Sequence, residues 1–339
     1  MLGAVGGRDL AVDLGTANTL IYVRGAGVVL DEPSVVAINV NTRRPVAVGV
    51  EAKRMIGRTP SHIQAVRPLK DGVIADFDVC EEMLRFFIDK VAGNRWGPRP
   101  RMVICVPSGI TGVEQRAVRD AAEFAGAREA VVIEEPMAAA LGAGLPVDEP
   151  VGSMVVDIGG GTTEVAIIAL GGLVVARSLR VGGDALDRAV IEHARRDHGL
   201  ALGERTAETI KVKMGSAQPL VEEFEAKIRG RDLVSGLPRT VVASTGEVRE
   251  AMADTVGSII GAVTAALDEA PAELAGDIIE RGMVLTGGGA LLRGLAGRFE
   301  REVGVPVRTA DDPLHTVVLG SGRFLEANRL TGLVGSRPG

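Results

Sequence analysis

Two short segments of the chain repeat one pattern, an aspartate followed by a glycine turn and a threonine: Asp13-Leu14-Gly15-Thr16 and Asp157-Ile158-Gly159-Gly160-Gly161-Thr162. Each lies between two apolar runs, which predicts a strand, a glycine turn and a second strand. Glycines let successive N–H groups point at one ligand, so each turn can form an anion nest. An aspartate beside a bound phosphate requires a cation between them, because like charges repel. The pair of hairpins therefore predicts two similar halves that hold ATP with Mg²⁺ from both sides.

A single Asp-x-Gly-Thr segment would be weak evidence, since ordinary hairpins contain such turns too. Two copies in the same strand context, about half the chain apart, favour the ligand interpretation. On this interpretation Thr16 and Thr162 offer hydroxyl groups to the phosphates. Asp13 and Asp157 hold Mg²⁺ through its waters, because this ion keeps much of its hydration shell.

Size and composition limit the remaining choices. The 339 residues exceed the length at which one hydrophobic core stops growing, which favours two domains. A net charge of −6 provides no basic field for a nucleic acid, so no nucleic-acid partner is expected. Two cysteines are too few for a disulfide framework and favour a reducing cytoplasm. Residues 1–10 do not resemble a signal peptide, and the apolar runs are interrupted before the ~18 residues that a membrane span needs.

Strands and helices are expected to alternate along the chain. A helix over 78–92, with Asp78 and Glu81 as its capping pair, precedes a strand over 101–106 and a helix from 112 to about 125 capped by Thr111 and Glu114. After the second hairpin we expect a strand over 173–181, helices over 184–197, 204–214 and 246–269, a strand over 283–285 and a final helix striped by Leu291, Leu295, Phe299 and Val303. This order favours two α/β halves with the ligand between them, joined through the glycine-rich segment 142–152.

Two further motifs can carry chemistry. Three consecutive glycines, 287–289, follow a strand and suit close approach of a nucleoside, although a tight strand-to-helix turn would use them equally well. Glu134 and Glu135 precede Pro136 at the junction of a strand and a small-residue helix. A carboxylate there can orient or deprotonate an attacking water. The alternative, stronger for Glu134, is a first-turn residue that the helix dipole favours.

These motifs, in this order, resemble those of the actin, heat-shock chaperone and sugar-kinase superfamily. From about residue 10 to 325 the chain resembles the MreB family of bacterial actins within that superfamily. The match includes residues 13–20, 31–38, 56–60, 67–76, 133–140, 157–164 and 280–289. The resemblance implies an α/β, actin-like ATPase fold: two ribonuclease-H-like cores, each with a smaller inserted subdomain, and the nucleotide in the cleft between. By position the first core would be 1–32, 76–145 and 312–339 with its insert at 33–75, and the second 146–182 and 244–311 with its insert at 183–243.

The resemblance also implies site residues. The pair that positions the attacking water would be Glu135 and Thr162. Nucleotide contacts would come from the first phosphate loop, the second phosphate loop, the adenosine-side helix and the loop beneath the nucleotide: Thr16, Ala17 and Asn18; Gly159, Gly160, Gly161 and Thr162; Glu208, Thr209, Ile210 and Lys211; Gly288, Gly289, Ala290 and Leu291. Without the resemblance, Glu208 and Lys211 would be interpreted as an i,i+3 ion pair on an exposed helix face.

The implied function is that of an ATP-binding, slowly ATP-hydrolysing cytoskeletal protein. It would polymerise into paired protofilaments at the inner face of the cell membrane and organise cell-wall synthesis with partners such as RodZ, MreC and MreD. The alternative on the same fold is a small-molecule kinase, but no Asp-centred motif suggests the catalytic base such an enzyme needs. A peptide-binding chaperone would need a β-rich substrate domain after the nucleotide core, and the chain is too short for one.

Membrane contact is the least constrained feature. The segment 92–100 holds the chain's only tryptophan, Trp96, near Arg95, Arg99 and Arg101. Tryptophan favours the lipid headgroup level and arginine favours an anionic surface, so direct attachment through Trp96 is one expectation. The alternative is that Trp96 packs on its own domain. The histidines His62, His193, His198 and His315 share no metal-ligand spacing, and none is predicted to bind a metal.

Overall fold

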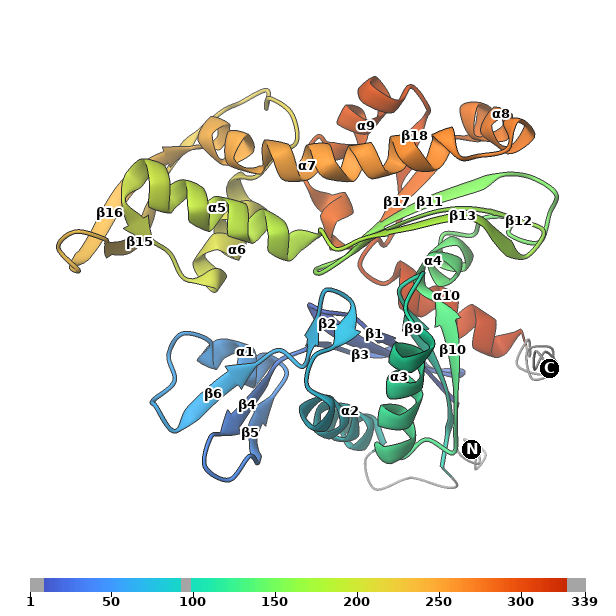
Figure 1. The fold of residues 1–339 in the computed structure, drawn as a ribbon, viewed down its shortest axis with the longest axis horizontal. Coiled ribbons are helices and arrows are strands. Elements are labelled where there is room, and N and C mark those ends of the chain that lie inside the picture. Colours follow the sequence, from blue (N-terminus) through green and yellow to red (C-terminus); the bar gives the residue numbers. More distant parts are fainter. Residues whose placement is uncertain (1–8, 93–98, 328–339) are drawn as a thin grey trace.

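The computed structural model describes residues 9–92 and 99–327, and its two halves each contain a five-stranded sheet (Figure 1). The first sheet has the order β10-β9-β1-β2-β3 and the second β13-β12-β11-β17-β18. In both, a three-stranded antiparallel meander is extended by two parallel strands. The two halves therefore repeat one topology, which confirms the duplication predicted from the hairpins. The strands are β1 (Leu10–Leu14), β2 (Asn18–Val23), β3 (Gly27–Pro33), β9 (Arg101–Val106), β10 (Glu129–Glu134), β11 (Ser153–Ile158), β12 (Thr163–Ala169), β13 (Gly172–Leu179), β17 (Met283–Thr286) and β18 (Val307–Thr309).

Each half also carries a smaller three-stranded sheet, and both small sheets lie at the same end of the molecule (Figure 1). The sheet β5-β4-β6 follows β3, and the sheet β14-β15-β16 follows β13. The first insert contains β4 (Val36–Asn39), β5 (Pro45–Val48), α1 (Val50–Met55), β6 (Ile63–Val66), β7 (Leu69–Lys70) and β8 (Val73–Ile74). The second contains α5 (Gly183–His198), β14 (Leu200–Ala201), α6 (Glu204–Met214), β15 (Glu225–Asp232) and β16 (Pro238–Ser244). The exact boundaries between the two cores and their inserts, at residues 33, 76, 146, 183, 244 and 312, stay a prediction.

Helices cover the outer faces of the two large sheets and separate their inner faces. The outer helices are α2 (Phe77–Ala92) and α3 (Gly112–Phe124) on the first sheet, with α7 (Thr245–Asp268), α8 (Ala272–Arg281) and α9 (Leu295–Val303) on the second. Between the sheets lie α4 (Glu135–Gly142) and α10 (Thr316–Glu326). Three alanines of α4, 138–140, are fully buried in a core that also contains Val103 of β9 and Val155 of β11. The small residues thus let α4 join the two halves at close range.

The closest helix–helix approach predicts a stability effect. A Cβ atom on Gly320 of α10 would lie 1.7 Å from the carbonyl oxygen of Ala138 in α4, so alanine cannot fit without separating the helices. We expect Gly320→Ala to destabilise the protein by about 2 kcal/mol or more through overpacking. Gly261→Ala is the matched control, because Gly261 lies inside α7 with no atom near its missing side chain. That change should stabilise by roughly 0.5–1 kcal/mol. Urea unfolding measures the free energy of unfolding of both variants. Equal changes in the two variants would contradict the close helix packing at Gly320.

Two helix starts differ from the sequence prediction. The capping box of Thr111 and Glu114 on α3 is confirmed. The one proposed for α2 is wrong: the helix begins at Phe77, and the Asp76 carboxylate accepts the Val79 N–H at 3.2 Å. The glycine-rich turn after β17 does not lead straight into a helix either, since it forms the 3₁₀ turn η2 (Gly288–Leu291) and α9 starts only at Leu295.

Helix α7 has the length and composition of a membrane span. Its apolar side chains pack against the second sheet, and Val256, Ile259 and Val263 are buried in the core of that half. The helix is therefore a core element of the fold.

Candidate nucleotide site

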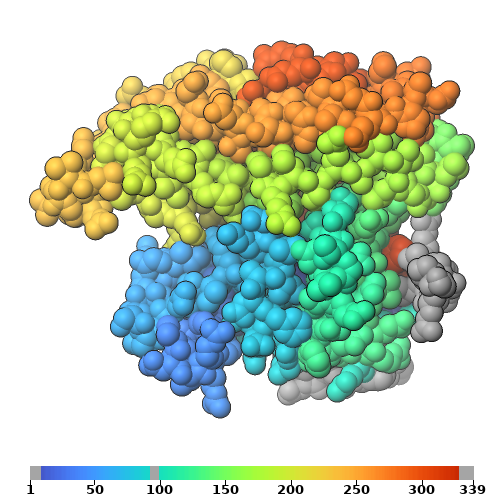
Figure 2. Space-filling model, in the orientation of Figure 1, coloured from blue at the N-terminus to red at the C-terminus, as the bar shows by residue number. Residues whose placement is uncertain are grey.

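A cavity of about 680 Å³ lies between the two halves. Its wall combines the two hairpin turns, the η2 turn, α4, and residues of both inserts. Such a volume lies within the range of small-molecule sites. The space-filling view shows the two halves parted at the insert end, where yellow and blue segments face each other (Figure 2).

The two hairpin turns face each other at the base of this cavity. A Cβ on Gly160 would lie 2.7 Å from the Cβ of Ala17, and one on Gly161 would lie 2.7 Å from Thr16 Oγ1. Only residues without a side chain permit this approach. The second turn is closed by the Gly159 N–H, which donates to the Thr162 carbonyl at 2.8 Å. The glycine turns and the threonines of both halves thus line one cavity, as the repeated motif predicts.

Acidic side chains gather beside the turns. Asp13 is the penultimate residue of β1, Asp157 is the penultimate residue of β11, and Glu135 begins α4; all three line the cavity. Burial, followed by the charge of Asp31, raises the pKa of Asp13 to about 7. Burial, followed by the charges of Asp13 and Glu164, raises the pKa of Asp157 to about 8. Among the described residues Asp157 Oδ1 has no hydrogen-bond partner although it is buried. A buried carboxylate without a partner is costly, so this cluster fits a cation.

The structure separates the two adjacent glutamates. Glu135 is 8% exposed and faces the cavity, and burial together with the neighbouring Asp13, Glu164 and Asp157 holds its pKa well above the ordinary range. Glu134 ends β10, is exposed and does not line the cavity. Its side chain makes no capping hydrogen bond. Only Glu135 is therefore placed to act on a ligand.

Sequence reasoning gave no role to Glu164, the fourth acid of the cluster. Its side chain is fully buried on β12 and accepts hydrogen bonds from the Ser108 backbone N–H and hydroxyl and from the Ser178 hydroxyl. The charge of Glu164 adds to the raised pKa values of Glu135 and Asp157. A glutamate within an otherwise apolar strand was the available signal.

The opposite wall of the cavity is held by ion pairs. Glu208 Oε1 lies 2.9 Å from Lys53 Nζ, which belongs to the other half, and Lys211 Nζ lies 3.0 Å from Asp187 Oδ1 on α5. The alternative i,i+3 pair between Glu208 and Lys211 is thus not formed. Lys53 and Asp187 also line the cavity. No sequence motif marks either residue, because Lys53 is distant in the chain from Glu208 and Asp187 is distant from Lys211.

Most of the predicted nucleotide contacts line the cavity: Thr16, Ala17, Asn18, Gly159, Gly160, Gly161, Thr162, Glu208, Lys211, Gly288, Gly289 and Leu291. Three do not. The side chains of Ile210 and Ala290 are buried in the core of the second half, and the Thr209 hydroxyl donates to the Arg205 carbonyl within α6. The structure therefore gives these three side chains no contact with a ligand in this cavity.

Repeated sheets, paired inserts and a cavity walled by both hairpins define a protein with the actin-like ATPase fold. The MreB/Mbl protein family matches residues 7–332, and this chain belongs to that family. The cell shape-determining protein MreB of Escherichia coli K12 is 56% identical over 324 residues, which cover 94% of this chain and 93% of that protein.

Solved structures show the same fold. The structure of MreB5 of Spiroplasma citri bound to AMPPNP superposes with a TM-score of 0.92 at 37% identity and covers 97% of this chain and 99% of that chain. A MamK double helical filament superposes with a TM-score of 0.81 at 25% identity and covers 95% of this chain and 99% of that one.

Proposed function

We propose that the cavity binds ATP with Mg²⁺. The main support is that two glycine turns and a cluster of carboxylates line one cavity of nucleotide size. The cluster includes one aspartate from each half. The AMPPNP bound by the Spiroplasma relative has the same adenosine and a similar triphosphate, which supports the assignment. The turns around Thr16 and Thr162 would receive the phosphates. The wall formed by Glu208, Lys211 and the η2 turn would receive the nucleoside.

Asp13 and Asp157 would hold Mg²⁺, through its waters. The donor set suits this ion, because hard cations favour carboxylate and water oxygens. When bound, Mg²⁺ would neutralise phosphate charge beside the two aspartates. Glu135 and Thr162 would position the attacking water, with Glu135 as the base that takes its proton.

The raised pKa values predict how the nucleotide-free protein responds to pH. A carboxyl with a higher pKa in the folded than in the unfolded chain binds more protons when folded, so folding loses stability as pH rises. For Asp13 and Asp157 this loss extends from about pH 4, the ordinary value, to the folded values of about 7 and about 8. A bound cation favours the charged carboxylates. Mg²⁺–ATP should therefore raise the melting temperature more at about pH 8 than at about pH 6.

Differential scanning fluorimetry at both pH values measures this difference. The Asp157→Asn variant is the comparison, because it keeps the side-chain shape and removes one titrating group. A Mg²⁺–ATP shift in the wild type that is the same at both pH values would contradict the titration of these aspartates.

We further propose that the chain is a cytoskeletal protein that polymerises with ATP into paired protofilaments and hydrolyses it slowly. The double helical filament of MamK and the cell shape-determining function named for the Escherichia coli relative support self-assembly and a role in cell shape. The filaments would lie in the cytoplasm at the inner face of the cell membrane. There they would organise cell-wall synthesis with partners such as RodZ, MreC and MreD.

Light scattering tests this proposal against a small-molecule kinase. Scattering should rise when Mg²⁺–ATP is added and should not rise with Mg²⁺ alone. Phosphate should be released without any added acceptor. ATP turnover that requires a sugar or another small acceptor, with no increase in scattering, would favour the kinase.

Direct membrane contact through Trp96 is a separate proposal and rests on the sequence, because Trp96 lies outside the described residues. Each basic residue near an anionic surface contributes about 1 kcal/mol. A filament repeats the segment along its length, so weak monomer binding becomes firm. We expect polymer to pellet with anionic liposomes and Trp96→Ala polymer to pellet less. Equal pelleting of the two would assign attachment to a partner protein.

A further inference from the structure

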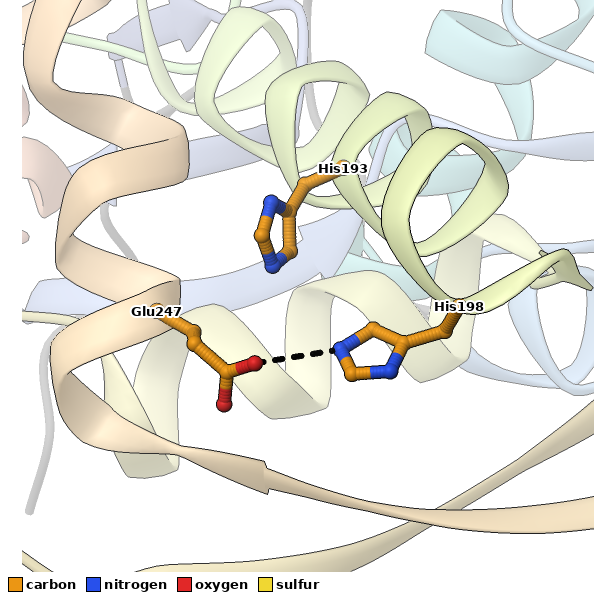
Figure 3. A group of neighbouring side chains, drawn as sticks. All are labelled: His193, His198 and Glu247. Carbon is orange, nitrogen blue, oxygen red and sulfur yellow. Dashed lines mark ion pairs between the residues drawn. The ribbon is translucent and has the colours of Figure 1, made fainter.

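Three potential metal ligands meet where one helix ends and another begins, outside the nucleotide cavity. His193 and His198 lie on the last turns of α5, and Glu247 lies on the first turn of α7 (Figure 3). One nitrogen or oxygen atom from each lies within 4.8 Å of the other two. No sequence pattern indicates this group, because its third member comes from a distant helix.

The two imidazoles are largely buried and poorly satisfied. The side chains of His193 and His198 are 12% and 16% exposed. Among the described residues, Nε2 of both rings is buried without a hydrogen-bond partner. His193 Nδ1 lies 2.7 Å from the Asp197 carboxylate on the same helix, an ion-pair contact without hydrogen-bond geometry, and Nε2 is the nitrogen left open to a ligand. Buried polar atoms are normally satisfied, so two unsatisfied nitrogens in one cluster point to a missing ligand.

The separation of His198 from Glu247 suits coordination better than a hydrogen bond. His198 Nε2 lies 3.4 Å from Glu247 Oε1 (dashed in Figure 3). In a tetrahedral zinc site with bonds of about 2.0–2.2 Å, two neighbouring ligand atoms are about 3.4 Å apart. The pair already has the spacing of one edge of that tetrahedron.

Glu247 is oriented by its role in capping α7. Its other oxygen, Oε2, accepts the Ser244 N–H at 2.6 Å and the Ser244 hydroxyl at 3.0 Å. These bonds fix the carboxylate and leave Oε1 facing His198. On the other side, Asp197 lies against His193 Nδ1 and is itself held by Arg196 at 2.8 and 3.0 Å. A carboxylate behind a ligating histidine is the arrangement that orients histidines in zinc sites.

We propose that His193, His198 and Glu247 form a zinc site with water in the fourth position. Two imidazoles and one carboxylate favour Zn²⁺ over Mg²⁺, which prefers oxygen ligands alone. The ion would tie the end of α5 to the start of α7. The first turn of α5 carries Gly183 and Asp184 in the wall of the nucleotide cavity, so the site would anchor the far end of a helix that borders the nucleotide.

The experiment measures Zn²⁺ binding to the full chain in excess Mg²⁺ by competition with a chromophoric chelator, and the absorption spectrum of the Co²⁺-substituted protein. Wild type should bind one Zn²⁺ and give the intense visible spectrum of tetrahedral Co²⁺. His193→Ala and His198→Ala should each bind Zn²⁺ about 100-fold more weakly, and Asp197→Asn about tenfold. His62→Ala is the control, because His62 is exposed and distant in the chain, and it should bind as wild type does.

Glu247→Gln separates coordination from folding, because glutamine also serves at this capping position. Without zinc it should melt as wild type does, and with zinc it should gain less stability. Equal Zn²⁺ affinity of wild type and both histidine variants would overturn the proposal. So would a wild-type Co²⁺ spectrum without the tetrahedral bands.

Discussion

Asp157→Ala is expected to reduce the affinity for Mg²⁺–ATP by about 10- to 100-fold and to abolish polymerisation, while the fold survives. Loss of a group that holds a metal through its outer shell typically has this effect. The fold should survive because the change removes a buried carboxylate that has an unsatisfied oxygen and lies beside other acids. Without Asp157 the second half would lose its proposed contact with the ion, so that nucleotide binding would draw the two halves together less strongly.

Titration calorimetry with ATP, in the presence and absence of Mg²⁺, measures the binding effect. Asp254→Ala is the matched control, because Asp254 is an exposed aspartate on α7 away from the cavity. It should bind and polymerise as wild type does. An Asp157→Ala variant with wild-type ATP affinity under both conditions would remove Asp157 from the metal site.

Glu135→Ala should bind ATP and polymerise but release phosphate about 10²-fold more slowly, the usual effect of losing a general base. The buried carboxylate faces the cavity, and its raised pKa makes it a stronger base than an exposed glutamate once it is deprotonated. The wild-type hydrolysis rate should accordingly rise with pH until Glu135 is fully ionised.

Glu134→Ala is an unusually close control, since the neighbouring carboxylate lies outside the cavity wall. Its phosphate release should match wild type. If Glu135→Ala also releases phosphate at the wild-type rate, Glu135 only starts the helix. If both variants slow equally, the effect belongs to the strand–helix junction and not to a base.

The parts of the fold that the sequence predicted are those set by local pattern. The hairpins at Asp13 and Asp157 combine apolar runs with glycine turns, and both formed where expected. The capping box of Thr111 and Glu114 on α3 is also a local pattern, because the two residues are only three positions apart. The start of α2 was misjudged because Asp78 and Glu81 have capping spacing too, whereas the residue that caps the helix is Asp76, which accepts the Val79 N–H at the same three-residue spacing.

The features that the sequence did not predict depend on contacts between distant segments. Glu208 was predicted to contact the nucleotide, and its ion pair with Lys53 from the other half follows from no local pattern. Glu164 lies opposite Asp157 in the β11–β12 hairpin, but its hydrogen bonds to Ser108 come from the other half and follow from no local pattern. The meeting of His193 with Glu247 depends likewise on how α5 packs against α7.

Electron microscopy of the purified protein tests the central proposal most directly. With Mg²⁺–ATP the wild type should form filaments of paired protofilaments, and Asp157→Ala should form none under the same conditions. Filaments of the same form and abundance in wild type without nucleotide, or in Asp157→Ala with ATP, would contradict a polymer controlled by the metal–nucleotide site. A wild type that stays monomeric with Mg²⁺–ATP at all concentrations would contradict the cytoskeletal function itself.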